Sequence, residues 1–294
     1  NTLQNTNSNT SNYKLGITKY NKSNYLNFII EHNNMAYGIP PSLEGHINGV
    51  DIELIKNTFQ ANYHYDASFK NFDQLDIKYN YINYSHKEFE KDAVGVGLHK
   101  ITNNIKMEIQ SPNIVLGSEL DYKQFFSTGF HLTPNTQELD ISLFGFYEKD
   151  YDTYDVLGSI RLGNISITPE EYTYQNLDNT QVDKRNFSYI SSSLGLRKII
   201  SDFEINSWLM NTMRAPRVEE LYSDGPHLGS YSYEIGEPNL QLEKIYGVES
   251  SIRYNHNTLN MAFTAFYNYS PYYYQMTKMG ECNEEIILNN QVHP

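Results

Sequence analysis

Strict alternation of apolar and polar residues is the feature that most limits how this chain can fold. Between Leu75 and Tyr81 the odd positions are apolar or aromatic, while the even positions are polar. The same period of two runs through residues 139–143, 203–209, 248–254 and 259–267. A period of two places successive side chains on opposite faces of a β-strand, so the sequence predicts many strands with one apolar and one polar face.

Turn-forming residues and polar stretches divide the chain into about eleven or twelve such strands. Tight hairpins are predicted at Asn103-Asn104, Ser201-Asp202 and His256-Asn257. Longer polar stretches, expected as loops at the opposite strand ends, cover residues 40–49, 88–92, 147–154, 169–184 and 214–244. Short turns at one end and long loops at the other are typical of outer-membrane barrels. We therefore expect an all-β, antiparallel transmembrane barrel with no helix of consequence. A soluble β-sandwich or β-helix, which also alternates, is the competing structure.

Composition narrows the function classes. A net charge of −13 argues against a nucleic-acid partner, which normally requires a basic surface. The single cysteine, Cys282, excludes an intramolecular disulfide framework and a cysteine-based zinc module. The sequence has no run of about 18 apolar residues, so it predicts no membrane-spanning helix. A spanning β-strand, however, needs only about 10 alternating residues. The 26 tyrosines suit a wall between water and lipid, although a bias toward Asn, Lys, Ile and Tyr would also raise their number.

An ordered motif occupies residues 211–243. Its members are Arg214, Pro216, Glu219, Glu220, Leu221, Tyr222, Gly225, Pro226, His227, Tyr233, Glu234, Gly236, Pro238, Asn239, Leu240 and Glu243. In this order they resemble the late-barrel motif of the TonB-dependent receptors, which import scarce nutrients across the bacterial outer membrane. Two positions depart from the usual pattern, because Glu237 stands in place of Asn and Leu242 in place of Pro.

A second resemblance lies earlier in the chain. Residues 37–40, which read Tyr-Gly-Ile-Pro, together with residues 50–54 and the alternating strand at 75–84, are similar to the subgroup associated with zinc uptake. That subgroup often carries a His-rich insert after Tyr-Gly-Ile-Pro. In this chain the corresponding loop offers only Glu44 and His46 as candidate ligands.

The resemblance implies a barrel of 22 strands, filled by an N-terminal plug whose TonB box contacts the TonB complex. Ligand binds at the outer mouth, TonB pulls on the plug, and the ligand enters the periplasm. We therefore expect residues 1–294 to be a fragment of the barrel domain, without the plug and the C-terminal strands.

The expected function is TonB-dependent import of zinc or another divalent metal, with an iron–siderophore complex or haem as the alternative cargo. A passive porin or structural barrel is the alternative of another class. The expected partners are the TonB complex, outer-membrane lipid, and a metal ion or metal chelate. We expect no enzymatic activity and no catalytic cofactor, because no nucleophile–base arrangement with a supporting motif occurs.

Candidate ligands follow the strand that begins at Leu75. Its alternation, if extended, puts His86, Glu88 and Glu90 on the face that points into the lumen. Neighbouring side chains on one face lie about 6.6 Å apart, so two could share a cation with a third ligand. A bulge at residues 82–84 would reverse this assignment, and a solvated strand end is the alternative to a ligand site.

His227 is the second candidate, because the turn formed by Gly225 and Pro226 could aim its imidazole into the barrel mouth. Asp224 and Glu234 are nearby carboxylates, and the alternative role for His227 is to order the loop. We hypothesise that His227 forms a divalent-metal site with Glu88, Glu90 or His86, and that the plug supplies the remaining ligands.

Other motif residues are expected to be structural. An inward Arg214 should pair with Glu219 or Glu220, and Pro216 should fix the chain direction. Tyr272-Tyr273-Tyr274 could belong to an interfacial aromatic belt or to the extracellular rim. The scattered histidines are expected to be solvated strand residues: His32, His64, His99, His131 and His256.

Overall fold

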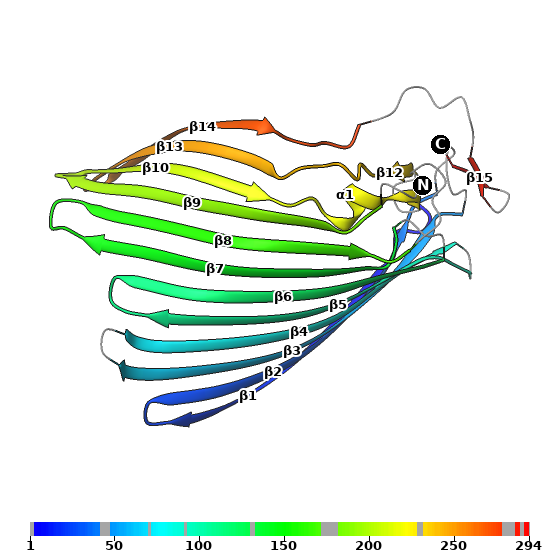
Figure 1. Ribbon diagram of the computed structural model, residues 1–294, viewed down its shortest axis with the longest axis horizontal. Helices are drawn as coiled ribbons and strands as arrows, with labels where there is room; N and C mark the ends of the chain where they lie inside the picture. The colour runs from blue at the N-terminus through cyan, green and yellow to red at the C-terminus, as the bar shows by residue number, and fades with distance from the viewer. Residues whose placement is uncertain are drawn as a thin grey trace.

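The protein is described by a computed structural model that covers residues 3–41, 48–69, 72–90, 93–129, 133–171, 182–227, 232–277, 286–288 and 291–293. One antiparallel sheet of twelve strands dominates it (Figure 1). The strands follow the order β1 (Ser8–Asn21), β2 (Asn24–Ile39), β3 (Val50–Phe69), β4 (Phe72–Glu90), β5 (Ala93–Gln110), β6 (Ile114–Gly129), β7 (Thr136–Asp150), β8 (Asp155–Pro169), β9 (Arg185–Ile200), β10 (Phe203–Arg214), β13 (Glu243–His256) and β14 (Leu259–Tyr272). The predicted all-β class and strand number are confirmed.

The connections differ sharply between the two ends of the sheet. At one end, the short-turn end, they span residues 22–23, 70–71, 111–113, 151–154, 201–202 and 257–258. At the other, the long-connection end, they span residues 40–49, 91–92, 130–135, 170–184 and 215–242. Outer-membrane barrels place short turns in the periplasm and long loops outside the cell. The long-connection end therefore corresponds to the extracellular end of such a barrel.

Small elements lie in or after the long connections. The connection between β10 and β13 contains the helix α1 (Val218–Tyr222) and the hairpin of β11 (Asp224–His227) and β12 (Ser232–Ile235). A second hairpin, β15 (Ile286–Leu288) and β16 (Gln291–His293), follows β14. Figure 1 shows α1, β12 and β15 at the same end of the sheet. Within the described residues, no helix has the length and apolar character needed to cross a membrane.

Two sequence predictions about turns are wrong. No hairpin occurs at Asn103-Asn104, where β5 continues without a break. Both amide side chains are satisfied inside the sheet, because Tyr79 donates its hydroxyl proton to Asn103 Oδ1 and Asn104 donates to Glu119 Oε1. Residues 147–154 are not a long loop: β7 continues to Asp150, and the remaining turn lies at the short-turn end.

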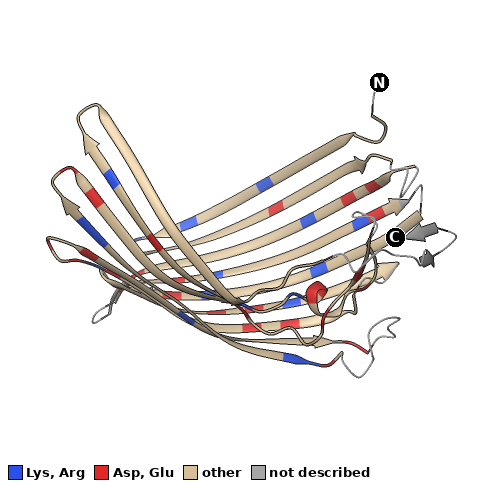
Figure 2. Cartoon of the chain, turned by 90° about the horizontal axis from the view of Figure 1, so that it is seen from above, with Lys and Arg blue, Asp and Glu red and all other residues tan. Residues whose placement is uncertain are grey.

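The two faces of the sheet have opposite character. On the outer face, register partners form apolar rows such as Leu194, Leu209, Val248 and Tyr267, all about half exposed or more. The inner face, against which α1 packs, carries ion pairs between strands, such as Lys123–Glu138 and Arg161–Glu119. Figure 2 shows charged residues spaced along the strands. Alternation with a period of two thus produces a wall that is apolar toward lipid and polar toward the lumen.

A small core forms at the long-connection end of the inner face. Its buried members are Ile167, Phe187, Val218, Leu221 and Tyr222. They come from β8, β9 and α1, so the core fastens the connection between β10 and β13 to the wall. The sequence prediction of no helix of consequence misses α1. The helix begins after Pro216, and its first turn is capped where Glu220 Oε2 accepts the backbone N–H of Arg217 at 2.7 Å.

Candidate metal site at the extracellular mouth

His86 and Glu88 lie side by side on the inner face of β4, as the alternation predicts. The Tyr84 hydroxyl lies 3.3 Å from His86 Nδ1, and His86 Nε2 donates to Glu88 Oε1 at 3.1 Å. β4 pairs with β5 without interruption from Gln74 to Glu88, so no bulge reverses the face. The Glu88 side chain is only 3% exposed, which makes it one of the few buried carboxylates on the wall.

The β11–β12 hairpin brings His227 to the same place. His227 Nδ1 donates to Glu234 Oε1 at 2.7 Å, across the hairpin. Its other ring nitrogen, Nε2, lies 4.0 Å from Glu88 Oε1. Residues that are distant in the sequence therefore meet in one group, the outer cluster, which consists of His86, Glu88, His227 and Glu234.

The electrostatics of the outer cluster favour a cation. The hydrogen bond to Glu234 raises the pKa of His227, and the charges of Glu234, Glu88 and Glu219 act in the same direction against the opposing effect of burial. A proton on His227 is therefore held more tightly than usual. A metal ion that binds the imidazole has to displace this proton.

The donor atoms have a defined arrangement. Both Nδ1 atoms face a partner, the Tyr84 hydroxyl or the Glu234 carboxylate, while both Nε2 atoms face Glu88 Oε1. Ligand atoms of a tetrahedral zinc ion lie about 3.3 Å apart, given bonds of about 2.0–2.1 Å. The 3.1 Å separation fits this value, and the 4.0 Å separation requires His227 to approach Glu88. As they stand, no three His, Cys, Asp or Glu side chains in the described residues are placed to hold a metal ion.

The remaining candidate ligands are Asp224, Glu90, Glu44 and His46. Asp224 is buried, and the Tyr233 hydroxyl donates to its Oδ1 and to its backbone oxygen at 3.1 and 3.2 Å. The side chain of Glu90, and the loop candidates Glu44 and His46, lie outside the described residues.

Arg214 anchors the connection between β10 and β13. Its guanidinium donates to both carboxylate oxygens of Glu220, and its Nε donates to Glu243 Oε2 at 2.7 Å. The expected ion pair with Glu220 is present, whereas Glu219 lines a nearby cavity instead. The Tyr274 ring, whose centroid lies 4.6 Å from the guanidinium carbon, makes a cation–π contact with Arg214. The sequence did not predict this contact.

The remaining motif residues shape this connection. The Tyr222 hydroxyl donates to the backbone oxygen of Asp183 at 2.8 Å, and burial raises its pKa to about 12. Gly236 lies so close to α1 that a Cβ atom would come within 2.6 Å of the Leu221 carbonyl, so only glycine fits. Gly225, Pro216 and Pro238 are buried, Asn239 donates its backbone N–H to Glu237, and the Pro226 side chain is not described.

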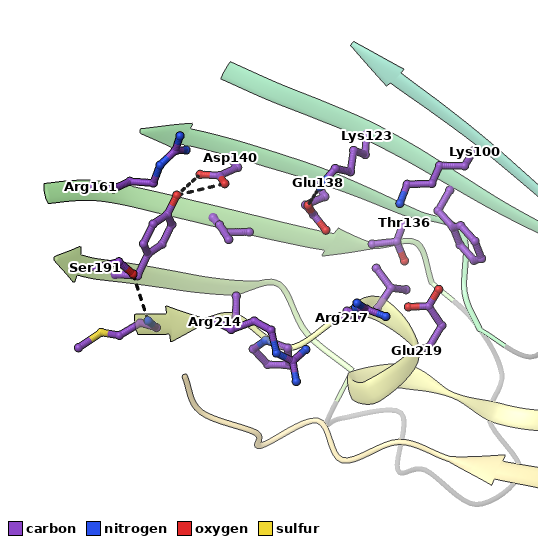
Figure 3. A pocket seen from close by; sticks show the side chains of 17 residues that line it. Lys100, Lys123, Thr136, Glu138, Asp140, Arg161, Ser191, Arg214, Arg217 and Glu219 are labelled. Carbon is purple, nitrogen blue, oxygen red and sulfur yellow. Dashed lines mark hydrogen bonds and ion pairs between the residues drawn. The ribbon is translucent and has the colours of Figure 1, made fainter. Parts of the chain in front are cut away.

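A cavity of about 540 Å³ lies between the inner face and the segment 213–219 (Figure 3). Part of its charged lining is paired within the cavity: Lys123 Nζ lies 2.6 Å from Glu138 Oε1, and the Tyr189 hydroxyl donates to Asp140 at 3.2 Å. Sequence reasoning missed this network. Its signal was present, because Glu138 and Asp140 alternate with apolar residues and therefore share a face.

Aromatic rings lie flat on glycines of the inner face. A Cβ atom on Gly163 would meet the Tyr189 ring at 2.3 Å, and one on Gly195 would meet the Trp208 ring at 2.5 Å. Each ring belongs to the residue directly opposite its glycine on the next strand. The absence of a side chain at each glycine leaves space for the ring, which would otherwise project into the lumen.

Together, the long twelve-stranded sheet, its apolar outer face and its polar inner face define part of an outer-membrane barrel. Residues 1–270 match the family described as TonB dependent receptor-like, beta-barrel, and the chain belongs to this family of bacterial outer-membrane proteins.

Solved structures share the fold at low sequence identity. The copper transporter OprC matches with a TM-score of 0.71 and 11% identity over 89% of this chain and 46% of its own. The hemophore receptor HasR of Serratia marcescens, solved with its hemophore HasA and heme, matches with a TM-score of 0.62 and 13% identity over 88% and 45%. The alcaligin receptor FauA of Bordetella pertussis matches with a TM-score of 0.63 and 10% identity over 90% and 44%. The chain thus spans less than half the length of each of these three proteins.

Proposed function

We propose that this chain forms the ligand-binding part of an outer-membrane importer for a divalent transition metal, with zinc as the first candidate. The observation that carries the proposal is the convergence of His86 Nε2 and His227 Nε2 on the buried oxygen Glu88 Oε1. Imidazole and carboxylate are the donors that zinc and related metals prefer. One of the structural neighbours is named as a copper transporter, and its cargo class supports this proposal.

In the proposed mechanism, the outer cluster captures the ion at the extracellular mouth. His86 and His227 bind through Nε2, while the Tyr84 hydroxyl and the Glu234 carboxylate hold the opposite ring nitrogens and fix both ring orientations. A plug domain supplies the remaining ligands. When the TonB complex pulls on the plug, these ligands are withdrawn and the ion enters the polar lumen.

An iron chelate or haem is the second candidate cargo. It is favoured by the cavity of about 540 Å³ on the inner face, whose size lies within the range usual for small-molecule sites. A chelate would contact the mixed charges of that cavity, whereas a bare ion would depend on the outer cluster.

The test uses the full-length receptor in detergent and in cells starved of zinc. His227→Ala and Glu88→Gln should each abolish tight zinc binding in calorimetry and impair zinc-limited growth. Glu234→Gln should weaken binding by roughly 10- to 100-fold, because it orients a ligand without contacting the metal. His99→Ala is the matched control, since that imidazole contacts Asn83 on the outer face. Unchanged zinc binding and growth in His227→Ala would refute the proposed metal site.

A further inference from the structure

A second group of metal-ligating side chains lies at the opposite end of β4. His64 of β3 stands on the inner face near the short-turn end, and its side chain is 18% exposed. Its Nδ1 lies 2.9 Å from Asp76 Oδ1 and its Nε2 lies 3.1 Å from Asp66 Oδ1. His64 is therefore held between two carboxylates. The sequence alone instead predicts a solvated side chain at this position.

The sheet register extends this group into a row. His64 lies directly opposite Asp76, and Asp76 lies directly opposite Glu108 of β5. On one face, such partners have Cβ atoms about 4.5–5.5 Å apart, so Asp76 lies between His64 and Glu108. As they stand, the three side chains do not yet surround a common point, and Glu108 has to move to join the other two. Tyr25 stacks on the His64 ring from the other side, with centroids 4.9 Å apart and planes 17° apart, and thereby fixes the imidazole plane.

This row is separate from the outer cluster. Asp76 and Glu88 are on the same face of the same strand, and at a rise of about 3.3 Å per residue they lie about 40 Å apart. The outer cluster faces the extracellular mouth, and the row faces the periplasmic exit. Both combine imidazole nitrogen and carboxylate oxygen on the lumen wall.

Two lysines lie near the Glu108 carboxylate and would compete with a metal ion for it. Lys106 Nζ lies 3.0 Å from Glu108 Oε1, and Lys78 Nζ lies 3.8 Å from Glu108 Oε2. Glu108 has to turn away from these ammonium groups before it can join His64 and Asp76. The nearby positive charges also oppose a bound cation, so a site built on this row is weaker than the outer cluster. Weak binding suits a position from which an ion has to leave.

We propose that His64, Asp76 and Glu108 form a second, weaker divalent-cation site on the exit side of the lumen. The inference rests on the proposed function, because it assumes that the same ion crosses the barrel. His64 Nδ1, Asp76 and Glu108 supply the ligands. Asp66 accepts the Nε2 proton and orients the ring, which is the usual role of a carboxylate behind a metal-bound histidine.

The experiment titrates the purified full-length receptor with Zn²⁺ in calorimetry and with Co²⁺ in absorption spectroscopy. The wild type should show a tight and a weak binding event. His64→Ala and Asp76→Asn should each remove the weak event and leave the tight one, and Glu88→Gln should do the reverse. Lys106→Gln should strengthen the weak event by roughly tenfold, because it removes a competing charge. His256→Ala is the control, since His256 contacts Asp202 at the same end of the sheet.

The outcomes separate this inference from the proposed function. Circular dichroism confirms that each variant is folded before it is titrated. If His64→Ala and Asp76→Asn titrate as the wild type, or if Lys106→Gln changes nothing, the second site is refuted while the tight site stands. If the tight event is missing in the wild type and a weak event disappears in His64→Ala, the outer metal site fails and the second site stands. If no event is seen, both fail.

Discussion

The two ends of the sheet are held in order by different means. At the long-connection end, a buried core and the Arg214 ion pairs fasten a long segment to the inner face. At the short-turn end, order comes from turns of a few residues, three of which contain a residue in the left-handed conformation: Asp152, Ser201 and Asn257. The comparison teaches that packing shapes the long-connection end, whereas local backbone geometry shapes the short-turn end.

The largest expected loss of stability comes from a substitution in the core at the long-connection end. Leu221 is fully buried, and Leu221→Ala should cost roughly 2–5 kcal/mol of packing free energy. Faster proteolysis within residues 215–242 would report the loss. As control, Leu259→Ala at the short-turn end, where Leu259 is 51% exposed, should cost about 0.5 kcal/mol or less. Equal protease sensitivity of the two variants would contradict the proposed difference between the ends.

A smaller effect is expected from Arg214→Lys. Lysine keeps the positive charge but loses the planar fork that contacts Glu220 and Glu243 together, so the change should cost roughly 1–2 kcal/mol. Hydrogen exchange should rise in α1 and stay unchanged in the β9–β10 turn. An unaltered exchange rate in α1 would mean that charge alone holds this segment.

Alkaline pH should loosen the long-connection end through Tyr222. Tyr222 has a pKa of about 12 in the folded chain, against about 10 for an exposed tyrosine. Its contribution is therefore complete below pH 10 and is lost as the pH rises toward 12. Tyr222→Phe should cost about 1 kcal/mol through the lost hydrogen bond to Asp183 and should remove its part of the alkaline transition. Proteolysis measured between pH 8 and pH 11 would show whether the wild type and the variant differ in this way.

The smallest effect concerns the short turns. Ser201 has φ of 54°, a conformation that asparagine tolerates better than serine. Ser201→Asn should therefore stabilise the β9–β10 hairpin by about 0.5 kcal/mol. Urea titration followed by the fluorescence of Trp208, the single tryptophan, would detect the shift. A destabilised variant would show that contacts of the Ser201 side chain outweigh its backbone strain.

The fold was largely predictable because its signal is local. A period of two identifies a strand and its faces from a few neighbours, which explains the success at residues 75–81. Asn103-Asn104 misled the prediction because asparagine is common in turns, whereas here the Tyr79 hydroxyl and the Glu119 carboxylate on neighbouring strands satisfy both amides. Such partners depend on register, which composition does not reveal.

The site was predictable only in part. The shared face of His86 and Glu88 follows from their spacing, but the approach of His227 depends on how the connection between β10 and β13 folds back. His64 was expected to be a solvated residue. Its contact with Asp66, two positions away, was visible in the sequence, while the one with Asp76 required the β3–β4 register. Glu243 and Tyr274 were missed as partners of Arg214 for the same reason.

The rings that lie on Gly163 and Gly195 project little from the inner face of the sheet. A tyrosine or tryptophan that stood upright on the wall would narrow the bore by the length of its side chain. Laid flat against a residue without a side chain, each ring adds little more than its own thickness. The glycines on this stretch of wall thus keep both rings close to the sheet, and a methyl group at Gly163 would push the Tyr189 ring away from it.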